Sequence, residues 1–471
     1  MPRYAYDRLT FLDRSFLLAE TANSPMHVGG AAKFEAGPLL KGDGGIDIDH
    51  IREYVASRLH RIPRYRQMLQ WTPIEGAPVW VDDPHFNVHY HVRHTSLPRP
   101  GDERQLKRLV GRILSQSLDR AKPLWEMWIV EGLEGNEHFA MVTKIHHCMV
   151  DGMSSVDLLE VLLSSEPKEK VEPAPRYVPR PSPTGLQLAM SEGLRRARAP
   201  LETALDIPRF FREVQDPRSD LRAMMRAVRG TVSSGLRTVS DTPINQKIGP
   251  HRRLDWLAMD LGRVKEVRRR LGGSLNDLVL ATVTGAMRTY LEGRDVNVDT
   301  LDFRVMAPVS VRSADERGTL GNRVSAWMVD LPIAERDPKR ALEKIRESTT
   351  RLKAEKQALG AEVLTTVASW TPSTLLSLGS RMVTRALPFN LVVTNVPGPQ
   401  VPLYLLGARM LDNYGQVPLI DHLGLGIVLF SYAGKLCWGF TADWDLLPDL
   451  HDVVIATEDA FADLCAAAGL A

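Results

Sequence analysis

The stretch from Lys144 to Gly152, K-I-H-H-C-M-V-D-G, constrains this chain more than any other part of it. It follows residues 139–145, which have the apolar character of a strand, and it leads into residues 153–163, which have helical periodicity. The H-H-x-x-x-D-G pattern therefore falls in a strand-to-helix turn. Such a turn presents a side chain at the end of a sheet, and a histidine placed there can exchange protons near neutral pH.

Within this turn we assign each residue a candidate role. His147 is the candidate general base, a role worth roughly 10²–10⁴ in rate. His146 points to the opposite face if the strand geometry continues, so only one imidazole can enter a site. Asp151 could orient the imidazole, coordinate a metal, or hold the turn by pairing with an arginine, for which Arg312 is the best partner. Gly152 lets the backbone turn close to a substrate.

Other chemistries fit the sequence less well. A zinc site made of His146, His147 and Asp151 lacks the H-E-x-x-H register, and Cys148 faces away from its neighbouring histidine on an extended chain. The sequence contains no G-x-S-x-G elbow, phosphate-binding P-loop or complete G-x-G-x-x-G fingerprint. Four further histidines include a period-two set expected on one strand face, but they lack acidic or cysteine partners; they are His85, His89, His91 and His94. We therefore predict no metal.

Composition limits the class of protein. With 471 residues and 44% hydrophobic content the chain is too long for one ordinary core, so two large domains are expected. The 59 basic and 57 acidic residues nearly balance, which argues against a nucleic-acid partner. Three cysteines without C-x-x-C spacing suit a reducing cytoplasm.

Membrane contact is expected to be peripheral at most. The longest apolar run, residues 423–433, is well short of the roughly 18 residues that would span a bilayer. An arginine-rich segment, residues 195–229, could lie on an anionic membrane surface, although a solvated crossover helix suits it better.

The order of predicted elements indicates a duplicated α/β architecture with mixed sheets. Residues 123–130 form a strand with Trp125 and Trp128 expected on one face. A Pro- and Glu-rich stretch after residue 164 is a surface linker, and Ser274 begins a capped apolar helix. We predict an N-terminal domain over residues 1–165, a linker with crossover helices over 166–250, and a C-terminal domain over 251–471.

Several spaced motifs, taken together, resemble the bacterial wax ester synthase/acyl-CoA:diacylglycerol acyltransferase family. They occur in one order along nearly the whole chain: Leu9 to Glu20, Met26 to Gly30, Pro78 to Asp83, Pro123 to Glu126, His146 to Gly152, Asn276-Asp277, Pro308 to Arg312 with Gly321-Asn322, and Thr394 to Pro399.

The resemblance implies two domains like chloramphenicol acetyltransferase, with a tunnel between them and no covalent acyl-enzyme. It implies that His147 takes the proton from an alcohol hydroxyl, which attacks the acyl-CoA thioester directly. Acyl-CoA is then a substrate, and no cofactor is implied. The remaining residues expected to shape the site or bind substrate are His146, Asp151, Gly152, Asn276, Asp277, Arg312, Trp125 and Asn395.

Three functions stay open. The first is synthesis of triacylglycerol or wax esters from diacylglycerol or a long-chain alcohol, in the cytoplasm and with peripheral contact to a membrane or lipid droplet. The second is acylation of another hydroxyl, on a polyketide or glycolipid, because acceptor preference depends on apolar contacts worth only about 1–3 kcal/mol each. The third is a catalytically silent lipid-binding protein of the same fold.

Overall fold

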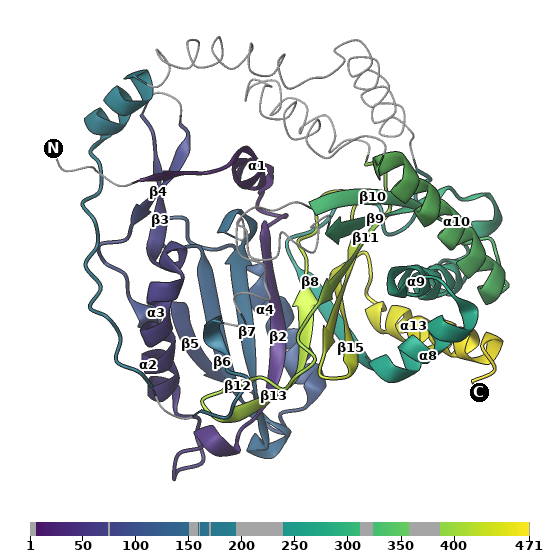
Figure 1. The fold of residues 1–471 in the computed structure, drawn as a ribbon, viewed down its shortest axis with the longest axis horizontal. Helices are drawn as coiled ribbons and strands as arrows, with labels where there is room; N and C mark the ends of the chain where they lie inside the picture. The colour runs from purple at the N-terminus through teal and green to yellow at the C-terminus, as the bar shows by residue number, and fades with distance from the viewer. Residues whose placement is uncertain are drawn as a thin grey trace.

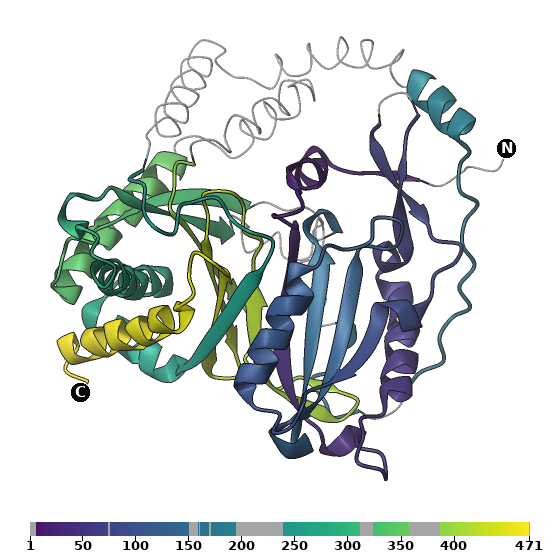
Figure 2. The ribbon, with the colours of Figure 1, turned by 180° about the vertical axis from the view of Figure 1, so that it is seen from behind.

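The computed structural model describes residues 6–73, 76–149, 159, 161–168, 171–194, 239–310, 324–357 and 387–470. Two six-stranded sheets stand side by side, and helices cover the outer face of each (Figures 1 and 2). This two-domain α/β architecture with mixed sheets is the fold class that the sequence predicted.

The first sheet has the order β12-β13-β2-β7-β6-β5. The pair β5–β6 is parallel, and the other neighbours are antiparallel. The strands predicted over residues 123–130 and 139–145 are confirmed as β6 and β7, which pair antiparallel. The strands are β2 (His27–Glu35), β5 (Val92–Ser96), β6 (Trp125–Leu133), β7 (His138–His146), β12 (Tyr404–Leu405) and β13 (Ala408–Gln416).

The strand β13 belongs by sequence to the second half of the chain but completes the first sheet. It pairs with β2 from Met410 opposite Phe34 to Gln416 opposite Gly29. The division predicted at residues 165 and 250 remains a prediction. Wherever that boundary lies, residues 404–416 supply β12 and β13, the two strands at one edge of the first sheet.

Both faces of the central strands β6 and β7 are covered, which explains their apolar runs, M-W-I-V and F-A-M-V. One face packs against α2 (Ile48–Arg58) and the short α3 (Val88–His91), and the other packs against α4 (Glu103–Ser115). Trp125 lies in the first of these cores and Trp128 lies against the second. The expectation that both face the same side is wrong, because residues three apart on a strand point to opposite faces.

The histidines around residue 90 do not share a strand face either. Residues 88–91 form a helical turn, α3, because the Asn87 side chain accepts a hydrogen bond from the His89 backbone N–H at 2.9 Å and caps it. His91 is buried beneath Trp125, whereas His94 lies on β5. The period-two pattern was therefore misleading.

The second sheet has the order β10-β9-β11-β14-β15-β8, and β11 runs parallel to both of its neighbours. Its outer face is covered by the four helices α8 (Leu261–Leu271), α9 (Leu275–Glu292), α10 (Pro338–Gln357) and α13 (Leu450–Ala467). The strands are β8 (Arg252–Asp260), β9 (Phe303–Ser310), β10 (Val324–Leu331), β11 (Leu391–Pro397), β14 (Leu425–Tyr432) and β15 (Lys435–Asp443).

The two halves meet where α4 and β13 contact the second sheet. α4 packs against β8, and the rings of Trp256 and Tyr414 stack with centroids 5.0 Å apart. β13 lies close against the second sheet where Gly415 of β13 faces Gly439 of β15. The two backbones can approach because residue 439 is glycine, since a β-carbon there would overlap the Gly415 carbonyl oxygen. A shared apolar core therefore joins the halves.

A third, small sheet anchors the connection between the halves. Its order is β1-β4-β3, with β1 (Asp7–Arg8), β3 (Gln67–Trp71) and β4 (Pro78–Asp82). Residues 171–184, expected to be a loose surface linker, run along this part of the molecule. The Tyr177 hydroxyl donates to two carbonyl oxygens at 3.2 Å, and the Arg180 guanidinium binds Asp82 at 2.8 and 3.0 Å. This strap is therefore bound rather than loose.

The arginine-rich residues 195–229 lie outside the described residues, as do most of residues 153–163, for which a helix is expected.

Candidate functional site

The histidine turn lies where the sequence placed it, at the end of β7. β7 ends at His146, and residues His147–Met149 form a short 3-10 turn. The His147 backbone N–H donates to the Met26 carbonyl at 2.8 Å, and the His146 N–H donates to the Leu124 carbonyl at 2.9 Å. The turn is thus held from both sides, by the residue before β2 and by the residue before β6.

The two imidazoles have different surroundings. The His146 side chain is 1% exposed; its Nδ1 accepts a hydrogen bond from the Cys148 backbone N–H at 3.1 Å, and its Nε2 lies 3.6 Å from the Glu20 carboxylate. The His147 ring is half-buried and stacks on Phe16, with centroids 3.8 Å apart and an interplanar angle of 22°. Of the two rings, His147 is the one that a substrate can reach more readily.

Glu20, which is not among the site residues predicted from the sequence, is a centre of polar contacts beside this turn. It follows the helix α1 (Phe11–Ala19), which begins with a capping box of Thr10 and Asp13. Its carboxylate accepts from the Arg120 guanidinium at 2.5 and 3.0 Å and from the Met26 N–H at 3.2 Å. Burial alone would raise the pKa of Glu20, but the neighbouring His146 ring and the hydrogen-bonded Arg120 guanidinium hold that pKa at about 2. The group is therefore a carboxylate at any ordinary pH.

Two further polar residues behind the turn are structural. His27 is packed on its strand, with Nε2 2.7 Å from the Leu114 carbonyl; burial and the charge of Lys144 lower its pKa to about 3. Buried Lys144 donates to the Ile113 and Gln116 carbonyls at 3.2 and 3.0 Å, at the end of α4. Both side chains fasten α4 to the sheet.

From the second half of the chain, the structure brings two predicted residues together. The Asn395 side-chain amide on β11 donates to the Asn276 side-chain oxygen on α9 at 2.7 Å. Because the Asn276 carbonyl oxygen is used in this bond, its own N–H groups point elsewhere. The residues lie 119 positions apart in the sequence, and this contact makes them one polar unit.

Asp277 and Trp125 have packing roles. Asp277 completes the capping box of α9 with Ser274 and accepts from the Thr349 hydroxyl at 2.8 Å. The Trp125 Nε1–H donates to the Tyr65 carbonyl at 2.8 Å, deep in the core of the first sheet. Either residue can shape the site through the elements it fixes.

Three predicted residues, Asp151, Gly152 and Arg312, lie outside the described residues, so the Asp151–Arg312 pair remains a prediction. In the part of the chain that the structure describes, no group of three His, Cys, Asp or Glu side chains is arranged to hold a metal ion. Likewise, none of the described helices is long and apolar enough to cross a membrane.

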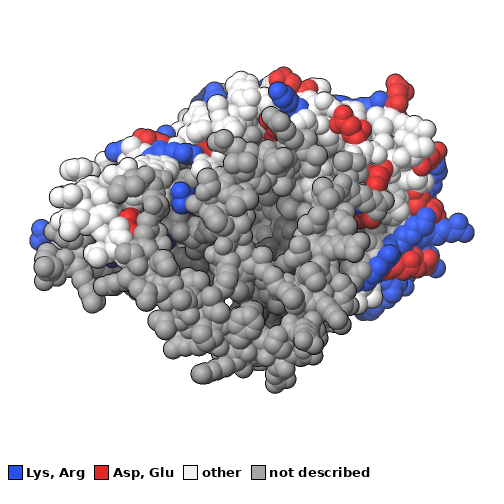
Figure 3. Space-filling view, turned by 90° about the horizontal axis from the view of Figure 1, so that it is seen from above, with Lys and Arg blue, Asp and Glu red and all other residues white. Residues whose placement is uncertain are grey.

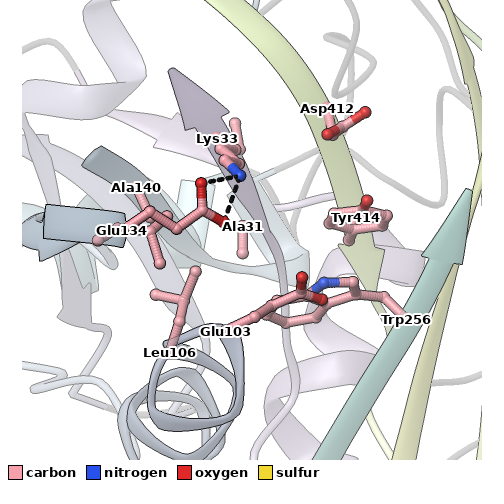
Figure 4. Close-up of a pocket in the computed structure, with 11 residues that line it drawn as sticks. Ala31, Lys33, Glu103, Leu106, Glu134, Ala140, Trp256, Asp412 and Tyr414 are labelled. Atoms are coloured by element: carbon pink, nitrogen blue, oxygen red, sulfur yellow. Dashed lines mark hydrogen bonds and ion pairs between the residues drawn. The ribbon is translucent and has the colours of Figure 1, made fainter. Parts of the chain in front are cut away.

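A small pocket lies between the halves but away from the histidines (Figure 4). Lys33 on β2 and Ala140 on β7 line the pocket and lie opposite each other in the sheet. This pair is six residues along the two strands from the pair His27 and His146. Its lysine is bound by both oxygens of Glu134 at 2.8 Å, and Trp256 and Tyr414 close its other side. Since its Lys33 and Glu134 charges are already matched, we do not assign the chemistry to it.

Together, the fold and the turn define a two-domain α/β protein that presents a histidine at the end of a sheet. Residues 9–279 match the model of the wax ester synthase/diacylglycerol acyltransferase catalytic domain, and residues 320–465 match the model of the C-terminal domain of the same family. The chain therefore belongs to the wax ester synthase/diacylglycerol acyltransferase family, and it is an acyltransferase.

Relatives and solved structures agree. The O-acyltransferase WSD of Acinetobacter baylyi is 30% identical, over 95% of this chain and 94% of that protein. A probable diacylglycerol O-acyltransferase of Mycobacterium tuberculosis is 31% identical, over 98% and 96%. The wax ester synthase/diacylglycerol acyltransferase of Marinobacter aquaeolei VT8 is 26% identical with a TM-score of 0.70, covering 98% of this chain and 100% of that structure.

A more distant structure shows the fold alone. The starter condensation domain of rhizomide synthetase is 12% identical, with a TM-score of 0.58, and covers 99% of this chain and 95% of that chain.

Proposed function

We propose that the chain is an acyl-CoA-dependent O-acyltransferase that makes triacylglycerol, wax esters or both, with His147 as the general base. The observation that supports this most strongly is the placement of His147 in a chain of this family. Its ring is half-buried, stacked on Phe16 and backed by a turn that is hydrogen-bonded on both sides. A base needs such a fixed orientation to meet a hydroxyl at hydrogen-bond distance.

The reaction balances without a cofactor. The acceptor hydroxyl gives its proton to the neutral imidazole of His147 while its oxygen bonds to the thioester carbonyl carbon. The tetrahedral intermediate then collapses, the carbon–sulfur bond breaks, and the imidazolium returns the proton to the departing thiolate. Ester and free coenzyme A are the products, and His147 is again neutral.

The other predicted site residues support this chemistry. We propose that Asp151 pairs with Arg312 to hold the turn that carries His147, and that Gly152 lets the backbone approach the substrate. Asn276 and Asn395 would form a polar part of the opposite wall, with the Asn276 N–H groups available to substrate. Asp277 and Trp125 would act through the helix and the core that they fix.

The test measures free-thiol release from one acyl-CoA with diacylglycerol, hexadecanol or a short alcohol. We expect release only when an acceptor is supplied and a loss of about 10²–10⁴ in kcat for His147→Ala. His89→Ala, which removes an exposed histidine of α3, is the matched control and should keep full activity. Full turnover by His147→Ala would remove the base assignment. Tight acyl-lipid binding without thiol release with any of these acceptors would instead favour the catalytically silent lipid-binding protein. Activity only with a polyketide or glycolipid hydroxyl would show that this hydroxyl is the acceptor.

We also propose peripheral contact with a membrane or lipid droplet in the cytoplasm. Residues 185–194 are helical and bury Leu188 against β4, yet Leu186, Met190 and Leu194 are 72, 61 and 59% exposed. Residues four apart share a helix face, so these three form one apolar stripe. It directly precedes the arginine-rich sequence, a combination suited to an anionic lipid surface.

Seen from above, the described surface carries both basic and acidic side chains (Figure 3). Replacing the three stripe residues by serine should abolish sedimentation with anionic vesicles and leave turnover of a soluble short alcohol unchanged. Undiminished sedimentation of that variant would contradict the proposal.

A further inference from the structure

The helix α1 contacts both histidines of the turn, although it is more than a hundred residues away in sequence. Phe16 stacks on the His147 ring, and Glu20, one residue beyond the helix, faces His146. Figure 1 shows α1 lying across the end of the first sheet where β2 begins. One short element therefore approaches the candidate base from two directions.

The contacts of Glu20 reach the residues on both sides of His147. One carboxylate oxygen accepts from the Met26 N–H at 3.2 Å, and the Met26 carbonyl in turn accepts from the His147 N–H at 2.8 Å. The other oxygen lies 3.6 Å from His146 Nε2. His146 Nδ1 accepts from the Cys148 N–H at 3.1 Å. Two separate chains of contacts thus lead from Glu20 to the backbone at His147 and to that at Cys148.

The contacts that run through His146 also fix the tautomer of its imidazole. Because His146 Nδ1 accepts a backbone hydrogen bond, the proton of the neutral ring sits on Nε2, which faces Glu20. A negative charge there holds the ring in this orientation, and the ring holds the turn. His146 Nε2 has no hydrogen-bond partner among the described residues, and the charge that it faces is the Glu20 carboxylate at 3.6 Å.

We propose that Glu20 is a positioning residue for the acyl transfer, acting through His146 and Met26 to fix the turn that presents His147. This inference rests on the proposed function, since it assumes that His147 is the base. Phe16 limits rotation of the His147 ring, whereas Glu20 fixes the backbone that carries it. Phe16 and Glu20 thus restrict the orientation in which the imidazole meets the acceptor hydroxyl.

A purely structural role for Glu20 makes a different prediction, and Arg120 separates the two. Both Glu20→Gln and Arg120→Gln break the ion pair that joins the end of α1 to residue 120. Only Glu20→Gln also removes the negative charge that faces the His146 ring. If the ion pair alone mattered, the two variants would behave alike.

The experiment compares kcat, KM for acyl-CoA and thermal stability in Glu20→Gln, Arg120→Gln and Leu18→Ala. Leu18 lies on the same helix but is 57% exposed, so its variant should match the wild type. We expect kcat of Glu20→Gln to fall by about 10–100-fold, because a displacement near 1 Å can cost roughly 10²-fold. KM should change little, and Arg120→Gln should lose similar stability but much less kcat.

A double-mutant cycle tests the route. If Glu20 acts through His146, Glu20→Gln combined with His146→Gln should lose little more kcat than the worse single variant, because coupled residues are not additive. If the losses of kcat in the two single variants add fully in the double variant, Glu20 does not act through His146. Should Glu20→Gln fail to fold, Glu20→Asp keeps the charge but withdraws it by one methylene, and an unchanged kcat in that variant would overturn the proposal.

The outcomes also separate this inference from the proposed function. If His147→Ala keeps full turnover, the base assignment fails first. If His147→Ala is inactive while Glu20→Gln has the kcat of Arg120→Gln, the base stands and the positioning role of Glu20 is wrong.

Discussion

The pair Asn276-Asp277 allows one prediction to be worked out in detail, because the two neighbours have different contacts. Asp277 accepts hydrogen bonds from the Ser274 N–H and hydroxyl at 2.7 and 2.8 Å and from the Thr349 hydroxyl at 2.8 Å. It therefore ties the start of α9 to α10. Asn276 instead faces Asn395 on β11. We expect Asp277→Ala to affect mainly stability and Asn276→Ala to affect mainly catalysis.

The size of the effect follows from the lost contacts. Asp277 is the capping-box partner of the N-cap Ser274, so its removal leaves the cap in place but loses the hydrogen bond from the Ser274 N–H, worth about 0.5–1.5 kcal/mol. The buried Thr349 hydroxyl loses its carboxylate partner and keeps only the Arg346 carbonyl at 3.2 Å; losing a hydrogen bond to a charged group costs about 1.5–3 kcal/mol. Together these give a loss of roughly 2–4 kcal/mol in the free energy of unfolding. Asp277→Asn keeps the size and one acceptor oxygen, so it should lose less than half as much.

The assay combines denaturant unfolding with thiol release normalised to folded protein. Asp277→Ala should unfold at clearly lower denaturant concentration while keeping most of its kcat per folded molecule. Asn276→Ala should show the reverse. The reasoning fails if Asp277→Ala has wild-type stability and no activity, since the carboxylate would then act on substrate rather than on the helix.

Three further predictions concern other contacts. The pKa of Glu20 is lowered to about 2 from an ordinary value of 4.5. Its ion pairs therefore contribute stability that is fully present above about pH 4.5 and is lost as the pH falls towards 2. In acid titrations followed by circular dichroism, the stability advantage of the wild type over Glu20→Gln should shrink in this window. Trp125→Phe loses the hydrogen bond to the Tyr65 carbonyl and should cost about 1–3 kcal/mol in thermal unfolding, with kcat per folded molecule unchanged. Gly29→Ala places a β-carbon against the Thr143 carbonyl between β2 and β7, so little soluble protein should be recovered, whereas Gly42→Ala, in open space, should express normally.

The sequence predicted the histidine turn because the relevant signals are local. An apolar strand and two histidines follow one another directly, and the structure confirms the strand and the start of the turn as β7 and residues 147–149. The capped helix after Ser274 was predictable for the same reason. The family motifs added Asn276 and Asn395, although not the hydrogen bond between them.

What the sequence could not show depends on contacts between distant segments. Glu20 becomes important only when the end of α1, the end of β7 and Arg120 meet, and no spacing rule connects these three. The helical turn at residues 88–91 was missed because alternating histidines imitate a strand, while the cap at Asn87 that decides the structure is a single side-chain bond.

The pairing of β13 with β2 has a consequence for the order in which the molecule can be made. During synthesis, β2 emerges from the ribosome long before residues 408–416, and until they arrive it has an open edge with unpaired backbone groups. Such edges invite pairing with other chains. A fragment ending near residue 165 would retain that edge permanently and should aggregate, whereas adding residues 404–416 in trans as a peptide should suppress the aggregation. The halves of this enzyme are thus unequal partners in folding: the first cannot be finished before most of the second has been translated.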